Sequence, residues 1–165
     1  MNKRVGTQDG SYKGGVGQEV KHVFLDQFGC FASLVAAVFA AGHLKEEAHY
    51  RQLLSIPDFA EPHPYHPGEL QLRARDEQGN EYYTLSAGVY GCFVKTVLGP
   101  EILRLLGTQK QMLIYDLSTI NPWSLCILEM LTRGRFRKYI KTIWAKYLSA
   151  RMPSLVRRIK QQNCL

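Results

Sequence analysis

The feature that most constrains the fold is a short apolar run followed by a glycine turn and an alanine-rich segment. Residues 20–26 combine β-branched and aromatic side chains over a length that suits one buried strand. The turn at 27–30 contains Gly29, and residues 31–42 are rich in alanine and end on a glycine that suits a helix C-cap. A strand, a glycine turn and a helix in this order open a βα unit, so we predict an α/β fold.

Later segments add a hairpin, another strand and more helices. An alternating stretch and an aromatic, β-prone stretch flank the turn sequence Asp-Glu-Gln-Gly-Asn, which predicts a β-hairpin over 70–86. A second apolar strand is expected at 111–116, and helices are expected at 46–54, 89–98, 100–106, 118 to about 131, 136–148 and 153–162. We therefore predict a small, mostly parallel sheet flanked by helices, with the hairpin at one side and a helical C-terminus.

Length and composition limit the class of protein. The chain has 165 residues, of which 45% are hydrophobic and 21% charged, and this excludes a wholly disordered chain. No apolar run is long enough for a membrane span, and no apolar segment follows the basic start as in a secretory signal. We expect a flexible, glycine-rich arm at 1–19 and a single domain at 20–162. Four widely spaced cysteines indicate reduced thiols and a cytoplasmic protein.

The positive charge is concentrated at one end of the chain. The net charge is +7, but residues 1–132 contain 11 basic and 14 acidic residues, a net charge of −3. Residues 133–165 contain ten basic residues and no acid, and 136–148 has the spacing of a basic amphipathic helix. This pattern suggests binding to nucleic acid, to an anionic membrane or to an acidic protein. The predicted basic patch consists of Arg133, Arg135, Arg137, Lys138, Lys141 and Lys146.

An ordinary surface helix is the alternative interpretation of this basic segment. Tyr139, Trp144 and Tyr147 are available for stacking on bases or for a membrane interface. At helical spacing, however, such aromatic residues more often face the protein core, and the lysines and arginines are then simply solvated.

A candidate ligand site lies at the turn before the first helix. If strands 20–26 and 111–116 are parallel neighbours, the residues after both strands meet at one sheet edge. A helix N-terminus there attracts a small anion, Gly29 allows close approach, and Ser33 offers a hydroxyl. The candidate residues are Gln27, Gly29, Cys30, Ser33, Asp116, Ser118, Thr119 and Asn121. In the alternative interpretation, Gly29 only makes the turn and Phe28 and Phe31 pack over it.

Other chemistries have weaker signals. Cys30 at a helix start, or Ser33, suggests a hydrolase or phosphatase, but a phosphatase loop of the Cys-x5-Arg type requires Arg where Ala36 stands. His63 and His66 have a spacing that can chelate a metal, but their proline-rich surroundings favour an exposed loop. We predict no metal and no cofactor.

Several segments together resemble a known family. They are the glycine turn with its alanine-rich helix, Ile-Pro-Asp-Phe at 56–59, the hairpin sequence at 76–85 and a strand ending near Asn121. Over roughly 20–160 the chain resembles a family of small bacterial proteins, mainly from Bacillus and Clostridium relatives, that is classified as a domain of unknown function. That family's turn reads Tyr-Gly-Gly-Thr-His-Ser-Ser. Here Gly29 and Ser33 match, whereas Cys30 replaces the second glycine and Ala32 the histidine.

The resemblance implies a fold and no activity. Because the family's histidine is absent, it implies a divergent member of the family. Our leading hypothesis is therefore a non-catalytic or degenerate protein that binds a small anion at the first turn. An interaction module that uses the basic segment, and a hydrolase that uses Cys30 or Ser33, are the alternatives.

Overall fold

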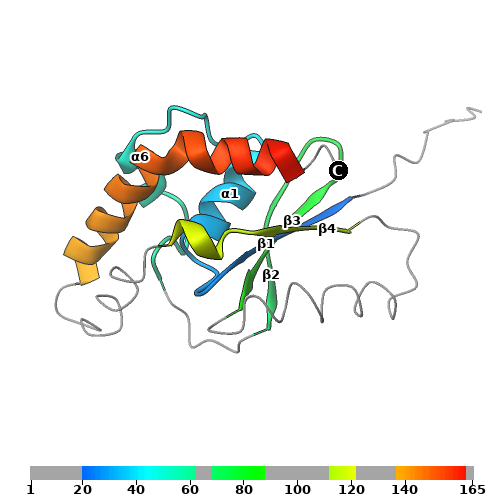
Figure 1. Ribbon diagram of the computed structural model, residues 1–165, viewed down its shortest axis with the longest axis horizontal. Helices are drawn as coiled ribbons and strands as arrows, with labels where there is room; N and C mark the ends of the chain where they lie inside the picture. Colours follow the sequence, from blue (N-terminus) through cyan, green and yellow to red (C-terminus); the bar gives the residue numbers. More distant parts are fainter. Residues whose placement is uncertain (1–19, 62–67, 88–111, 122–136, 163–165) are drawn as a thin grey trace, which may run out of the picture.

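The computed structural model describes residues 20–61, 68–87, 112–121 and 137–162 (Figure 1). The predicted arm at 1–19, the helices at 89–98 and 100–106 and most of the helix expected after 118 lie outside these residues. His63, His66, Arg133 and Arg135 lie outside them too, as does the side chain of Arg137. The assignment of 20–162 to one domain stays a prediction.

The described strands form one sheet of mixed direction. They are β1 (Lys21–Asp26), β2 (Leu70–Arg75), β3 (Glu81–Ser86) and β4 (Met112–Asp116), in the spatial order β2-β3-β1-β4. Strand β1 runs parallel to both β3 and β4, while β2 is antiparallel to β3 and forms the hairpin at one side. The prediction of a mostly parallel sheet with a hairpin at one side is therefore confirmed.

The helices are α1 (Ala32–Ala40), α2 (Tyr50–Leu54), the 3₁₀ turn η3 (Ser118–Ile120) and α6 (Arg137–Gln162). The prediction of a helix over 46–54 was wrong in its first half. His49 has an extended backbone and its side chain accepts a hydrogen bond from the backbone N–H of Arg51. The side chain of Gln52 accepts from the backbone N–H of His49 at 2.8 Å. This reciprocal capping fixes the start of α2 at residue 50.

The prediction of two separate C-terminal helices was also wrong. Residues 137–162 form one helix with Pro153 inside it. A proline in a helix interior costs roughly 3 kcal/mol because it lacks an N–H and clashes with the preceding turn. Helix α6 continues because it buries side chains on both sides of Pro153, including Leu148 and Leu155. Figure 1 shows α6 changing direction along its length, as expected near an internal proline.

The main core lies between the sheet and the two longer helices. Helices α1 and α6 lie on the same side of the sheet (Figure 1), and Phe24 and Tyr115 of the sheet join Phe31 and Trp144 in one buried cluster. A smaller cluster around Val23, Leu25 and Leu85 occupies the other face. Within the described segments, no helix combines the length and the apolar character that crossing a membrane requires.

Candidate functional site

The predicted site lies where β1 and β4 end. Leu25 in β1 pairs with Asp116 in β4, so both strands reach the same sheet edge. The backbone N–H of Leu117 donates to the carbonyl of Leu25 at 2.9 Å, and that of Ala87 donates to the carbonyl of Asp26 at 2.9 Å. The turn after β1 and the 3₁₀ turn η3 thus leave the sheet side by side, as the sequence pattern predicted.

The carboxylate of Asp26 accepts hydrogen bonds from the backbone N–H groups that were expected to bind a ligand. Its side chain is fully buried. One carboxylate oxygen accepts from the backbone N–H of Phe28 at 2.8 Å and from that of Gly29. The other oxygen accepts from the backbone N–H of Ser33 at 2.9 Å. The chain therefore supplies its own anion to the turn and to the first turn of α1. An external anion at these N–H groups would have to compete with this carboxylate.

The backbone at Gly29 lies close to the end of strand β3. Its φ is +69°, and a Cβ on it would lie 3.2 Å from the backbone nitrogen of Ser86. The hydroxyl of Ser86 donates to the carbonyl of Gln27 at 3.0 Å. Gln27 and Gly29 therefore dock the turn on the end of β3.

Aromatic side chains pack over the same turn. Phe31 is fully buried and stacks on Trp144 of α6, with their ring centres 4.1 Å apart. Phe28 meets Phe31 edge to face at 5.5 Å. Cys30 is buried, and its carbonyl accepts from the N–H of Ala60 at 3.1 Å. The packing of Phe28 and Phe31 is the arrangement that the alternative interpretation of the turn required.

Three buried polar side chains near this edge have no hydrogen-bond partner within the described part of the chain. They are the hydroxyl of Ser33, the amide of Asn121 and the indole N–H of Trp144. Ser33 and Trp144 are 0% exposed and Asn121 is 4% exposed. Most buried polar groups in proteins are hydrogen-bonded, so three such groups within the described residues are unusual.

These three side chains stand on segments that contact one another. Ser33 lies two residues after Phe31, whose ring stacks on Trp144. One helical turn after Trp144, the hydroxyl of Tyr147 donates to the carbonyl of Ile120 at 2.9 Å, and Asn121 is the next residue. The sequence prediction included Ser33 and Asn121 but considered Trp144 only as a stacking ring or core residue, because a tryptophan in a helix gives no sign of whether its N–H finds a partner.

The remaining predicted residues lie at the rim of this edge. Asp116 accepts from the backbone N–H of Ser118 at 3.0 Å and from its hydroxyl at 2.6 Å. The hydroxyl of Thr119 accepts from the guanidinium of Arg158 in α6. The rim thus combines one carboxylate and one guanidinium, while Asp26 adds a second carboxylate beneath it.

The described part of the basic segment has many contacts inside the protein. Lys141 pairs with Glu61 at 3.3 Å and Lys160 with Glu46 at 3.6 Å. The ammonium of Lys146 lies 5.5 Å from the centre of the Tyr50 ring. Trp144 is in the core, so the core interpretation holds for this residue. Tyr139, in contrast, is 72% exposed, and Ile143 is 43% exposed. Lys138 is exposed as well.

No group of three or more metal-ligating side chains occurs within residues 20–61, 68–87, 112–121 and 137–162.

A comparison with protein families shows that the chain belongs to a family described as a protein of unknown function, DUF3189, which matches residues 21–163. No curated protein and no solved structure matches the chain. The resemblance to an uncharacterised family is therefore confirmed, and the family's description names no activity.

Proposed function

We propose that the protein is a non-catalytic binding protein that holds a small polar ligand at the carboxyl edge of its sheet. The single observation behind this proposal is that the buried polar groups of Ser33, Asn121 and Trp144 have no hydrogen-bond partner among the described residues. Leaving a buried polar group without a partner costs about 1–3 kcal/mol. A ligand that bonds to all three groups recovers this free energy on binding.

The ligand's chemistry follows from the donors and from the charge. The indole N–H only donates, whereas the Ser33 hydroxyl and the Asn121 carboxamide both donate and accept, so the three groups suit a ligand that presents oxygen acceptors and also hydroxyl or amide donors. Asp26 and Asp116 place two negative charges at this edge against the one positive charge of Arg158, so the edge opposes an anion more than a neutral molecule. A small neutral ligand with carbonyl or hydroxyl oxygens therefore suits the site better than the small anion expected from the turn.

A titration followed by NMR tests this proposal. The indole N–H of Trp144 is observed in the ¹⁵N-labelled full chain while glycerol, acetamide or inorganic phosphate is added, and Trp123→Phe assigns the signal. We expect a saturable shift with a neutral probe and a smaller shift with phosphate. Asn121→Leu should abolish it, whereas Gln78→Leu, at an exposed position of the hairpin turn, is the control and should keep it. A Trp144 signal that no probe moves, or that moves equally in Asn121→Leu, would contradict the proposal.

The buried thiol bears on the hydrolase alternative. Cys30 is a member of the buried hydrophobic cluster around Phe31, and a thiol in apolar surroundings is a poor nucleophile. Generic ester and phosphoester substrates should therefore be turned over equally slowly by the wild type and by the double variant Cys30→Ala, Ser33→Ala. A cytoplasmic location, predicted from the cysteine spacing, is part of the same proposal.

Helix α6 supports a second candidate function, binding to an anionic membrane surface. The supporting observation is the exposure of Tyr139 and Ile143 on a helix that contains no acid, next to the exposed Lys138. An exposed aromatic and an exposed aliphatic residue beside cations suit a lipid interface better than nucleic acid. We expect vesicles containing phosphatidylglycerol to bind the protein, with a loss in the double variant Tyr139→Ser, Ile143→Ser. Binding to DNA that survives this double variant would contradict the membrane proposal.

A further inference from the structure

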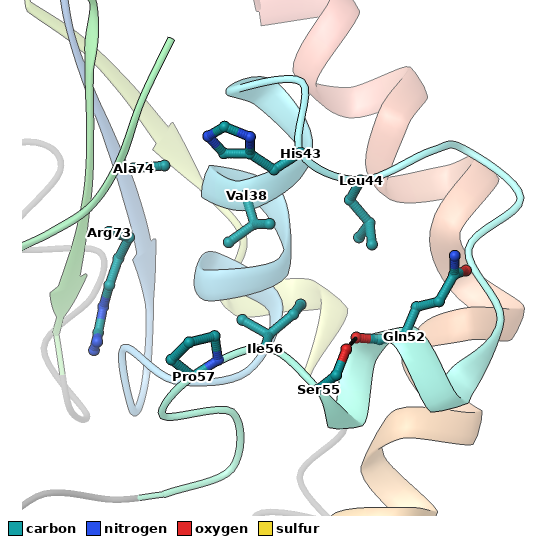
Figure 2. Close-up of a pocket in the computed structure, with 9 residues that line it drawn as sticks. All are labelled: Val38, His43, Leu44, Gln52, Ser55, Ile56, Pro57, Arg73 and Ala74. Carbon is teal, nitrogen blue, oxygen red and sulfur yellow. Dashed lines mark hydrogen bonds between the residues drawn. The ribbon is translucent and has the colours of Figure 1, made fainter.

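A pocket of about 400 Å³ lies between α1, α2 and β2, at a place distinct from the carboxyl edge (Figure 2). Five of its lining residues are apolar, and they come from α1, from the loops on either side of α2 and from the edge strand. These residues are Val38, Leu44, Ile56, Pro57 and Ala74. The volume is at the lower end of the range for small-molecule sites, so the pocket suits a ligand with a small apolar body.

Arg73 lines the pocket on its β2 side, and hydrogen bonds to Thr84 and Asp58 hold its guanidinium in place. The pairing of β2 with β3 shifts register between Leu72 and Ala74, so Arg73 is the extra residue of a β-bulge. Bulges redirect side chains and are frequent beside functional sites. The side chain of Arg73 is only 10% exposed. A charge at this depth must be held by partners.

Among the described residues, the partners of Arg73 leave part of its hydrogen-bonding capacity unused. Its Nε donates to the hydroxyl of Thr84 at 2.9 Å, one terminal nitrogen donates to Asp58 at 2.8 Å, and the other donates to Gln71. Asp58 makes this contact from a backbone φ of +60°, which is strained for a residue other than glycine. A guanidinium has five N–H groups, so two remain after these three contacts with described residues.

The other polar groups around the pocket are donors or neutral. Nε2 of His43 lies 3.3 Å from the carbonyl of Arg75. The side-chain oxygen of Gln52 accepts from the backbone of His49, which leaves its NH₂ group for other contacts. Figure 2 shows the aliphatic side chains of Val38, Leu44 and Ile56 between His43 and Ser55. Within the described residues, the lining includes no carboxylate.

We infer that this pocket binds a small carboxylate with an aliphatic or aromatic body. The apolar lining receives the body, and the carboxylate accepts hydrogen bonds from Arg73, whose fixed, planar donors match a carboxylate. Because Asp58 already balances the charge of Arg73, the gain from the carboxylate comes mainly from hydrogen bonds in a partly desolvated place. This site is independent of the one proposed at the carboxyl edge.

Titration of the full chain with hexanoate, 1-hexanol and acetate tests the inference, with binding followed by ¹⁵N NMR of the residues around the pocket. We expect hexanoate to bind at least roughly tenfold more tightly than 1-hexanol, which lacks the charge, and than acetate, which lacks the body. Ser55→Phe, which fills the pocket from an exposed position and leaves Arg73 untouched, should abolish hexanoate binding.

Two further variants separate the causes. Arg73→Gln should remove the preference for hexanoate over 1-hexanol, while Arg75→Gln, in the same strand and outside the pocket, should keep it. Asn121→Leu should leave hexanoate binding unchanged, so this site and the carboxyl-edge site can fail separately. Hexanoate that binds no better than 1-hexanol, or equally well to Ser55→Phe, would overturn the inference. If Arg73→Gln does not fold, the Ser55→Phe result decides.

Discussion

The carboxylate of Asp26, the last residue of β1, accepts the backbone N–H of Ser33 in the first turn of α1 at 2.9 Å. The other oxygen of the same carboxylate binds the N–H groups of Phe28 and Gly29. One buried side chain thus joins the strand, the turn and the helix. It also places a negative charge where the sequence pattern alone favoured a bound anion, and this changes the expected ligand.

Replacement of Asp26 should destabilise the fold strongly. Asp26→Asn puts an NH₂ group against backbone N–H donors, which leaves buried donors unpaired at about 1–3 kcal/mol each. We expect the free energy of unfolding to fall by about 2–4 kcal/mol in urea denaturation. Glu77→Gln, which also removes one carboxylate charge but at an exposed position, is the matched control and should change little. Equal stability of Asp26→Asn and the wild type would refute this role.

A side chain at Gly29 should cost more than one at another glycine of similar backbone conformation. Gly29 has φ +69° and Gly79 has φ +85°, but a Cβ meets Ser86 only at Gly29, and at Gly79 it enters open space. Both alanine variants bear the strain of the left-handed backbone, roughly 1–2 kcal/mol. Gly29→Ala should lose more stability than Gly79→Ala, because the backbone of β3 must also move. Thermal unfolding of the two variants measures the difference.

Stability should fall on mild acidification because of His22. Burial between the rings of Tyr82 and Tyr115 lowers the pKa of His22 below 6.5, and the charge of Asp76 offsets only part of this effect. The unfolded chain therefore takes up a proton at a higher pH than the native protein does. Stability is fully present above about pH 7 and decreases as the pH falls through 6.5 towards the lowered pKa.

The His22 prediction is checked by urea denaturation between about pH 7.5 and 5, a range above the ordinary carboxylate pKa values. His22→Phe should flatten the pH dependence over this range, whereas His43→Phe, at an exposed position, should retain it. A wild-type stability that rises on acidification over this range would be the opposite of the expected sign.

The sequence predicted the sheet because its signals were local. The apolar run before Gly29 and the turn chemistry at 76–80 define strands whatever packs on them. Helix α6 depended on tertiary packing instead. By local rules Pro153 ends a helix, but the buried side chains on both sides of it keep the helix continuous. The start of α2 was missed because His49 is not among the usual capping residues.

The candidate site was only partly predictable for a similar reason. The sequence predicted that Ser33 and Asn121 lie at one edge of the sheet, because parallel strands end at the same edge. It did not identify Asp26 as the partner of the turn. The sequence around an acidic residue at a strand end is the same whether its side chain faces solvent or accepts hydrogen bonds from the following turn. It also could not distinguish a Trp144 with a paired N–H from one without a partner, which depends on three-dimensional packing.

The most direct test of the proposed site is the free energy of unfolding of Asn121→Leu, measured by urea denaturation without any added ligand. If the amide of Asn121 has no partner in the protein itself, a leucine of similar size removes a buried, unsatisfied group. We then predict an increase in stability of about 1–2 kcal/mol together with the loss of ligand binding. A decrease of 1 kcal/mol or more would mean that Asn121 supports the fold, and it would contradict the account.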